Sequence, residues 1–312
     1  MPEPVLRAGV IGVGALGRHH ARVWAGVAGA RLVGIHDVDG ARAAEVAAAH
    51  GCRAFPGAES LIAESDVLSV AVPTVSHHAV ARLALERERD VLLEKPLTAT
   101  LAEADDLVAL AAARGRILQA GHIERFNPAT DVLLEAGRGA RFVEVHRLGS
   151  FSPRSLDVDV VLDLMIHDLD IVLALDGSDP VQIEAVGVPV LTPRVDIANA
   201  RLRFASGLIA NLTASRVSVE KVRKFRVFAP RTYVSVDFAA REAQVYRLEA
   251  DEQGRPRIAT ATRGAADAEP LRRQIESFAE TVRRRSAPVV SGADGRRALA
   301  LAHAILGKMA EA

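Results

Sequence analysis

Cysteine is almost absent from this sequence of 312 residues, which contains only Cys52. A single cysteine excludes an intrachain disulfide framework and a metal site built from cysteines. Long apolar runs are also lacking, since none reaches the roughly 20 residues that a membrane-spanning helix needs. The first apolar run, residues 5–11, is too short for a leader peptide and leads directly into a glycine loop. We therefore expect a cytoplasmic protein that does not associate with a membrane.

Net charge is absent as well, because 39 basic residues balance 39 acidic ones. This balance excludes a broad electrostatic attraction to nucleic acid. Lysine supplies only four of the basic residues, namely Lys95, Lys221, Lys224 and Lys308. A desolvated lysine amine can lose its proton near neutral pH, which a guanidinium cannot do. A lysine that follows an apolar strand is therefore a candidate for chemistry, and Lys95 is in that position.

The first 122 residues alternate short apolar runs with longer helical patterns. The apolar runs are residues 5–11, 31–36, 67–72, 91–93 and 117–120. The helical patterns are residues 15–27, 40–50, 77–87 and 101–114. Strands that alternate with helices form a parallel sheet with right-handed crossovers. We expect an α/β fold whose first domain, residues 1–122, is a doubly wound Rossmann domain.

The pattern changes after residue 122, where one helical segment at residues 160–175 precedes a series of β-like runs. These runs are residues 181–190, 197–204, 208–216, 225–229, 233–238 and 244–248. No helical pattern separates them, so an α+β domain at residues 123–290 with a large, mostly antiparallel open sheet is expected. Residues 253–267 are expected to form a loop or a ragged edge strand. A C-terminal helix within residues 291–312 is expected to pack back on the first domain.

A glycine loop, Gly12-Val13-Gly14-Ala15-Leu16-Gly17, follows the first strand and opens a helix. This spacing is typical of a dinucleotide-binding turn, although a glycine-rich turn without a ligand is the alternative. Asp37 ends the next strand, where its carboxylate would bind ribose hydroxyls and repel a 2′-phosphate. The sequence therefore favours NAD over NADP. The expected contacts from this region are Gly12, Gly14, Ala15, Leu16, Gly17 and Asp37.

The tripeptide Glu94-Lys95-Pro96 follows a buried strand, at the edge of the sheet where ligands bind in open α/β folds. Pro96 biases Lys95 away from helical geometry or permits a cis bond. Lys95 is therefore expected to be held at a defined angle over the ligand. The alternative is a lysine in an ordinary surface turn.

The helical segment at residues 160–175 is apolar on most sides but carries Asp163, His167 and Asp170 at i, i+4 and i+7. Buried polar side chains must be hydrogen-bonded. Two interpretations fit this pattern. Either Asp168 or Asp170 belongs to a structural network, or His167 is a general base that Asp163 orients. The further ligands that a catalytic metal needs are not evident.

These motifs together resemble the Gfo/Idh/MocA family of sugar and inositol dehydrogenases, and the resemblance spans essentially the whole chain. It implies that Val72-Pro73-Thr74, His77 and Glu94 line the nicotinamide, and that Lys95 is the catalytic lysine. By the same resemblance, His167 takes the proton from a sugar hydroxyl while the hydride goes to the nicotinamide. Asp163 then holds the catalytic groups in place.

Three segments are similar to a subgroup of that family whose members oxidise the 3-hydroxyl of UDP-N-acetylglucosamine to a 3-keto sugar nucleotide, as in amino-sugar and lipid A-type pathways. They are residues 121–128, 151–154 and 163–168. The implied substrate contacts are His122, Glu124, Arg125, Asn127, Arg154 and His167. For Arg125 and Arg154, surface salt bridges are the alternative. The glycines that often precede the family's aspartate are replaced here by residues 159–162, so the substrate's shape near them is open.

Two other functions remain open from the sequence. One is a family dehydrogenase that acts on a free sugar or inositol, and the other is a sensor of the same fold that binds NAD and sugar without turnover. The presence of Lys95, Asp163 and His167 argues against the sensor. An antiparallel sheet with a helix on one side leaves a face that needs cover. The resemblance implies that such sheets pair, so a homodimer or homotetramer is expected.

Overall fold

The computed structural model describes residues 5–151, 158–264 and 268–311. The chain divides into two compact units. The first comprises Met1–Ile123 and Glu269–Arg297, and the second comprises Glu124–Ala268 and Ala298–Ala312. The expected parallel sheet and the expected, mostly antiparallel sheet are both present, one in each unit.

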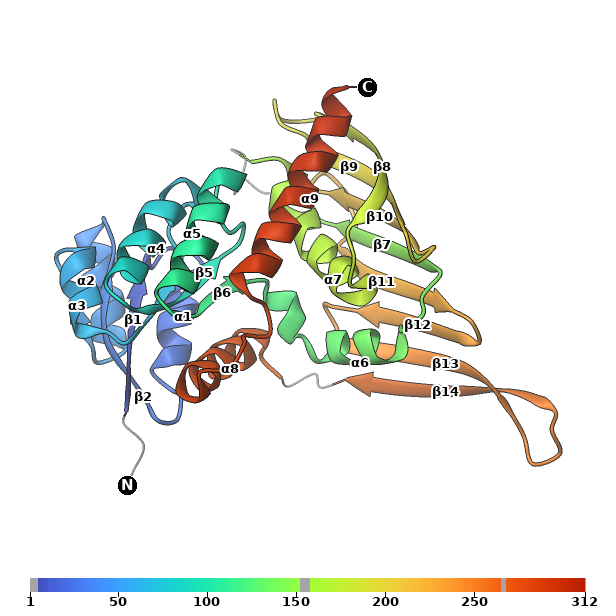
Figure 1. Ribbon diagram of the computed structural model, residues 1–312, viewed down its shortest axis with the longest axis horizontal. Helices are drawn as coiled ribbons and strands as arrows, with labels where there is room; N and C mark the ends of the chain where they lie inside the picture. The colour runs from blue at the N-terminus through green and yellow to red at the C-terminus, as the bar shows by residue number, and fades with distance from the viewer. Residues whose placement is uncertain (1–4, 152–157, 265–267, 312) are drawn as a thin grey trace. The chain divides into compact units, whose positions relative to one another are not determined.

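The first unit contains a six-stranded parallel sheet in the order β3-β2-β1-β4-β5-β6. Figure 1 labels β1, β2, β5 and β6 of this sheet. The strands are β1 (Leu6–Ile11), β2 (Ala30–His36), β3 (Arg53–Ala54), β4 (Val67–Val70), β5 (Asp90–Glu94) and β6 (Leu118–Gly121). This strand order is that of the dinucleotide-binding doubly wound fold. The central strands are buried on both faces, which explains their continuous runs of Val, Ile and Leu.

Helices connect these strands. They are α1 (Gly17–Trp24), α2 (Gly40–Ala49), α3 (Ala58–Glu64), the 3₁₀ turn η1 (Thr74–Ser76), α4 (His77–Glu86) and α5 (Leu101–Ala113). Thr100 and Glu103 form a reciprocal capping box at the start of α5. The sequence did not predict β3 and α3, because a strand of two residues and a helix of seven show little periodicity.

A further helix, α8 (Pro270–Arg284), belongs to the first unit, although the sequence placed residues 269–290 in the second domain. Its apolar side enters the core of the first unit, where the Phe278 ring packs edge-on against Trp24 with centroids 6.4 Å apart. Arg285, just after the helix, donates to Asp90 at 2.6 Å. Apolar burial therefore assigns this helix, which chain order alone did not.

The second unit contains an eight-stranded sheet in the order β14-β13-β12-β11-β7-β10-β9-β8. The strands are β7 (Phe142–Leu148), β8 (Pro180–Val188), β9 (Ile197–Phe204), β10 (Ile209–Ser215), β11 (Val222–Ala229), β12 (Thr232–Asp237), β13 (Glu242–Ala250) and β14 (Pro256–Gly264). Neighbours are antiparallel except β7 and β10, which are parallel. The sequence missed β7, which is central, and left β14 open as a loop or edge strand.

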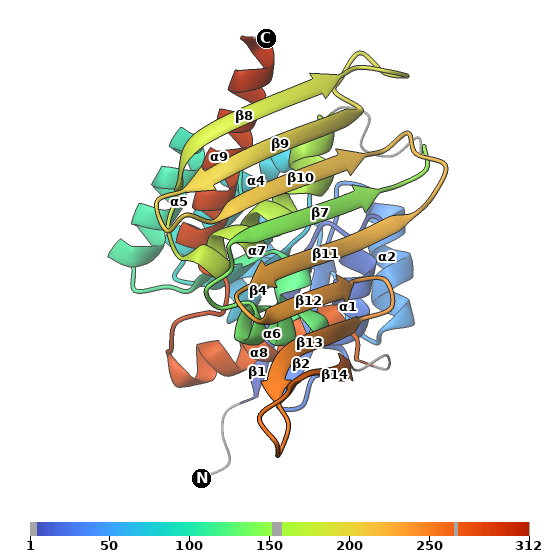
Figure 2. The ribbon, with the colours of Figure 1, turned by 90° about the vertical axis from the view of Figure 1, so that its right-hand side faces the viewer.

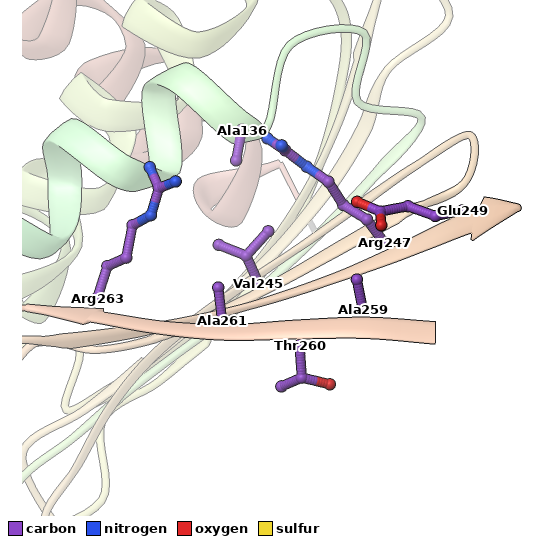
Figure 3. A pocket seen from close by; sticks show the side chains of 8 residues that line it. All are labelled: Ala136, Val245, Arg247, Glu249, Ala259, Thr260, Ala261 and Arg263. Atoms are coloured by element: carbon purple, nitrogen blue, oxygen red, sulfur yellow. The ribbon is translucent and has the colours of Figure 1, made fainter. Parts of the chain in front are cut away.

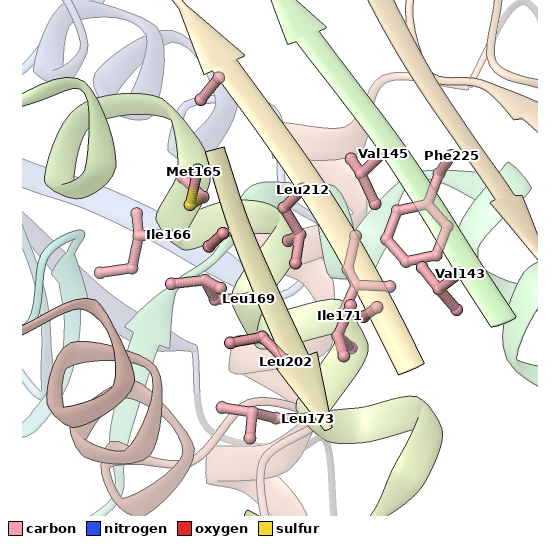
Figure 4. Close-up of a cluster of buried hydrophobic side chains, with 14 of the residues drawn as sticks. Val143, Val145, Met165, Ile166, Leu169, Ile171, Leu173, Leu202, Leu212 and Phe225 are labelled. Carbon is pink, nitrogen blue, oxygen red and sulfur yellow. The ribbon is translucent and has the colours of Figure 1, made fainter. Parts of the chain in front are cut away.

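Helices cover one face of this sheet, and Figure 2 shows α6 (Pro128–Ala136) and α7 (Ile166–Asp176) behind the strands. The core between α7 and the sheet is apolar, with Phe225 of β11 beside Val143 and Val145 of β7 (Figure 4). Two short turns complete this layer, the 3₁₀ turn η2 (Ile123–Phe126) and the π-helical turn η3 (Val161–Met165). Along these strands, buried residues alternate with half-buried or exposed residues. One face of the sheet is therefore buried, and the other is not.

The last helix, α9 (Gly292–Ala310), was expected to pack back on the first domain, and the structure divides it between the two units. Only its first residues, to Arg297, group with the first unit. Ala298, Leu301 and Ile305 instead belong to the apolar core of the second unit, because they form one apolar stripe at helical spacing. Among the helices of the described residues, none is long and apolar enough to span a membrane.

Candidate active site

The glycine loop joins β1 to α1, and each of its glycines meets a different environment. A Cβ atom on Gly12, whose φ is +82°, would lie 2.8 Å from the Ala71 backbone. On Gly17 it would lie 1.8 Å from the Gly12 carbonyl oxygen. On Gly14 it would meet no atom within 4 Å. The fold therefore requires glycine at 12 and 17, whereas Gly14 leaves open space that suits the approach of a diphosphate to the backbone.

Asp37 lies just after β2, with its side chain directed to the glycine loop. Its carboxylate accepts hydrogen bonds from the Val13 amide at 2.8 Å, the Asp39 amide at 2.9 Å and the Arg42 guanidinium at 2.7 Å. Burial acts to raise the pKa of Asp37, but these hydrogen bonds outweigh it and lower the pKa. The residue is thus a fixed carboxylate beside the loop, which fits the ribose of NAD. Arg42 was not anticipated from the sequence, because an arginine on an exposed helix carries no distinguishing signal.

Glu94, at the end of β5, is buried beside His20 of α1. The Nε2 atom of His20 lies 3.1 Å from Oε1 of Glu94, and the Lys95 amide donates to Oε2 at 3.2 Å. Burial acts to raise the pKa of Glu94, but the hydrogen bond and charge of His20, followed by Lys95, outweigh it and lower the pKa. Glu94 therefore fixes the backbone at Lys95. The peptide bond between Lys95 and Pro96 is cis.

His77 was expected to line the nicotinamide, but its side chain is buried, with 1% of the residue exposed. Its ring nitrogens lie 2.9 Å from the Pro96 carbonyl and 3.0 Å from the Val72 carbonyl. Burial lowers the pKa of His77, although the two carbonyls act to raise it. A neutral ring would donate to only one of the two carbonyls at a time. His77 therefore links the loops that follow β4 and β5. Val72, Pro73 and Thr74 precede it between β4 and α4, and each is partly or fully exposed.

Asp163 and His167 lie at the junction of the π-helical turn η3 and α7, and both are partly exposed. The sequence predicted one regular α-helix over residues 160–175. The structure instead inserts a wider turn at Val161–Met165, which changes the angle between residues four apart. Single π-helical turns inside helices occur frequently at functional sites.

Glu124 and Asn127, expected to contact substrate, are buried in a network of the second unit. Glu124 accepts from Arg147 at 3.0 Å and from the Asn127 amide at 3.2 Å. Asn127 also caps α6 and donates to the Phe238 carbonyl at 3.2 Å. Both side chains thus have protein partners.

Arg147 completes this network and was not anticipated from the sequence. It donates two parallel hydrogen bonds to Asp168, each 2.7 Å long. Burial acts first to raise the pKa of Asp168, and that pKa remains above its ordinary value. The available signal was one arginine in register with the buried Val143 and Val145 of β7.

The remaining expected substrate contacts have separate outcomes. Arg125 has a partly exposed side chain and lies 3.4 Å from Asp170. It therefore forms an ion pair, which was the alternative to a substrate contact. His122 is buried in the first unit. Arg154 lies outside the described residues. Asp168 and Asp170 both belong to ion pairs, as the structural interpretation of this helix predicted.

A pocket of about 190 Å³ lies in the second unit between β13, β14 and the end of α6 (Figure 3). It is lined by Ala136, Val245, Arg247, Glu249, Ala259, Thr260, Ala261 and Arg263. None of the expected site residues lines it. No group of three or more His, Cys, Asp or Glu side chains within residues 5–151, 158–264 and 268–311 is placed to hold a metal ion.

Both units of the chain match families of known proteins. Residues 6–122 match the family described as "Oxidoreductase family, NAD-binding Rossmann fold", and residues 140–234 match "GFO/IDH/MocA C-terminal domain". The chain is 43% identical over 299 residues to UDP-N-acetylglucosamine 3-dehydrogenase of Acidithiobacillus ferrooxidans, covering 95% of each chain. A crystal structure of that enzyme superimposes with a TM-score of 0.91 at 41% identity, covering 97% of each chain.

The name of a second relative indicates that it acts on a free polyol. This is myo-inositol 2-dehydrogenase of Thermotoga maritima, which is 27% identical over 318 residues, covering 96% of this chain and 95% of that one. The identity to the Acidithiobacillus enzyme, the two matched domains and the glycine loop agree with one another. The chain therefore belongs to the Gfo/Idh/MocA family of oxidoreductases, which bind NAD through a Rossmann fold.

Proposed function

We propose that this oxidoreductase transfers a hydride from the 3-carbon of UDP-N-acetylglucosamine to NAD and forms a 3-keto sugar nucleotide. The observation that carries the proposal is the 43% identity, over 95% of both chains, to an enzyme named for this reaction. The cofactor part also has support from geometry, because the free space at Gly14 and the fixed carboxylate of Asp37 suit a diphosphate and a ribose diol.

We propose that His167 is the general base, which would take the proton from the 3-hydroxyl as the carbon–hydrogen bond breaks. Asp163, four residues earlier, would orient that imidazole. Lys95 would stabilise the negative charge that develops on the substrate oxygen, and Glu94 fixes the backbone from which its side chain extends. Bound NAD supplies the hydride acceptor.

The proposed substrate contacts are narrower than those the sequence suggested. Arg125 keeps a partly exposed side chain, and its guanidinium would donate to a diphosphate. Glu124 and Asn127 are left out, since buried protein groups occupy their polar atoms. Arg154 stays a candidate from the sequence alone.

The direct test incubates the purified protein with NAD and a panel of UDP-sugars, hexoses and inositols, and follows NADH absorbance. We expect turnover with UDP-N-acetylglucosamine. Substrate labelled with deuterium at the 3-carbon should transfer the label to the cofactor, because that hydrogen leaves as hydride. An inert UDP-N-acetylglucosamine beside an oxidised free polyol would refute the proposal. That result would favour the second candidate, a dehydrogenase of a free sugar or inositol, which the Thermotoga relative supports.

The open face of the eight-stranded sheet supports a self-association proposal. Phe142, Phe228, Tyr233 and Tyr246 pair in register across β7, β11, β12 and β13. Their ring centroids are 5.7, 4.9 and 5.4 Å apart, and both tyrosines of the chain are among them. A continuous aromatic row on a face without helices is typical of an interface.

We propose that a second copy of the chain covers this row, giving a homodimer or homotetramer. Light scattering should show a smaller assembly for Tyr233→Asp than for the wild type, and an unchanged mass would contradict the proposal.

The cytoplasm is the proposed location, because the one cysteine is free, which fits a reducing compartment.

A further inference from the structure

One guanidinium joins two segments of the second unit that are distant in sequence. Arg147 of β7 donates to Glu124 of η2 at 3.0 Å and, through two 2.7 Å bonds, to Asp168 of α7. A second contact joins the same pair of segments, since Arg125 lies 3.4 Å from Asp170. Two sets of ion pairs therefore connect the turn that carries Arg125 with the helix that carries His167.

The three side chains of the network around Arg147 are almost fully buried. Arg147 is 4% exposed, Asp168 1% and Glu124 8%, and the Arg147 guanidinium also lies over the Phe238 ring at 5.6 Å. Removing three charges from water carries a large desolvation cost, which good geometry offsets only in part. Apolar side chains of similar volume would often give an equal or more stable core. A buried ionic triad at this position therefore points to a requirement for defined geometry.

We propose that Arg147 is a positioning residue, which sets the place of His167 relative to Arg125 by holding their neighbours Asp168 and Glu124. This inference rests on the proposed function, in which His167 takes the proton. Asp168 directly follows His167, and Glu124 directly precedes Arg125, so each anchor lies one residue from a functional side chain. The bidentate bond to Asp168 fixes the first turn of α7, immediately after the π-helical turn.

Arg147→Lys is the first test, because an ammonium keeps the charge but cannot donate the same planar pair of bonds while also reaching Glu124. We expect kcat to fall by roughly tenfold to 100-fold, the scale of a small misplacement of catalytic groups. KM for NAD should change by less than about twofold, because Arg147 lies in the second unit. The matched control is Arg285→Lys, which weakens another arginine–aspartate pair, to Asp90 at 2.6 Å, and should keep kcat.

A triple variant separates positioning from simple charge balance. Arg147→Met leaves two carboxylates in the core and should lower Tm. Adding Glu124→Gln and Asp168→Asn removes those charges and should restore much of the Tm. If Arg147 is a positioning residue, kcat stays low in the triple variant. Recovery of kcat together with Tm would show a purely structural role and overturn the proposal.

Hydrogen exchange gives a readout that does not depend on the reaction. In Arg147→Lys, amides of η2 and of the first turn of α7 should exchange faster together, and in Arg285→Lys they should not. Unchanged exchange in both segments, or a kcat within about twofold of the wild type, would overturn the proposal. If the wild type oxidises another substrate, the proposed function fails, and the same comparison of kcat on that substrate still tests Arg147.

Discussion

His20 of α1 and Glu94 of β5 form a buried pair in the first unit, with Nε2 and Oε1 3.1 Å apart. The pair connects the helix that follows the glycine loop to the backbone of Lys95, whose amide donates to the same carboxylate. The nucleotide-binding turn and the proposed catalytic lysine are thus coupled through one carboxylate.

We predict that Glu94→Gln lowers the free energy of unfolding by about 1 to 3 kcal/mol at neutral pH, because a buried charge-assisted network is lost. The folded-state pKa of Glu94 is below its ordinary value of 4.5, so its stabilisation is present above that value and is lost as pH falls through the folded pKa. Urea unfolding at a series of pH values checks this. A deficit in Glu94→Gln that does not shrink in acid would contradict the assignment.

Gly14 allows the roles of cofactor binding and folding to be separated. Gly14→Ala should weaken NAD binding by more than about tenfold and leave Tm nearly unchanged, since its Cβ meets no protein atom within 4 Å. Gly57→Ala, another glycine without a neighbour at that distance, is the control and should keep NAD affinity. Gly12→Ala should instead lower Tm, because of its φ of +82°. Calorimetric titration and thermal melts measure the two effects, and normal NAD affinity in Gly14→Ala would exclude the loop as the diphosphate site.

Asp37 should control the choice of cofactor. Asp37→Ala is expected to weaken NAD relative to NADP by about tenfold or more, because the ribose loses an acceptor and a 2′-phosphate is no longer repelled. The matched control is Asp39→Ala, which removes the N-cap of α2 and should cost about 1 kcal/mol of stability without changing the ratio. Kd values for both cofactors provide the measurement. The same NAD to NADP ratio in Asp37→Ala and the wild type would refute this role.

His77 is expected to act on stability. His77→Ala removes the donor that lies between the Val72 and Pro96 carbonyls, and it should destabilise the protein by about 1 to 3 kcal/mol. The adjacent His78→Ala, which loses a partly exposed pair with Asp106, should cost about 1 kcal/mol or less. Denaturant unfolding of the two variants compares them. Equal stabilities would mean that the buried ring does not link the two loops.

Asp196 gives a prediction for the second unit. Its carboxylate accepts from the amides of Val190, Leu191 and Thr192 at 2.7 to 2.9 Å and from the Thr192 hydroxyl. Burial acts to raise its pKa, but these bonds lower it to about 2. Asp196 therefore stabilises the fold above its ordinary pKa of 3.8, and this contribution is lost as pH falls toward 2. Asp196→Asn should be less stable at neutral pH, with a flatter acid dependence of Tm, and an unchanged acid profile would contradict this.

The sequence by itself determined the parallel sheet of the first unit apart from β3, its cofactor class and the family. Glycine spacing, buried strands and an acidic residue after β2 are local patterns, and local patterns can be read without tertiary contacts. The antiparallel strands of the second unit, apart from β7 and β14, were equally local and were confirmed.

Tertiary structure alone decided which polar residues are occupied. Glu124, Asn127 and His77 look like ligand contacts in a motif, but their partners lie on segments distant in sequence. Chain order also misplaced α8, whose Phe278 packs on Trp24. Arg147 was missed for the same reason, because an arginine in a strand becomes significant only when the fold brings two carboxylates to it. Burial and long-range pairing depend on the whole chain, which no window of sequence contains.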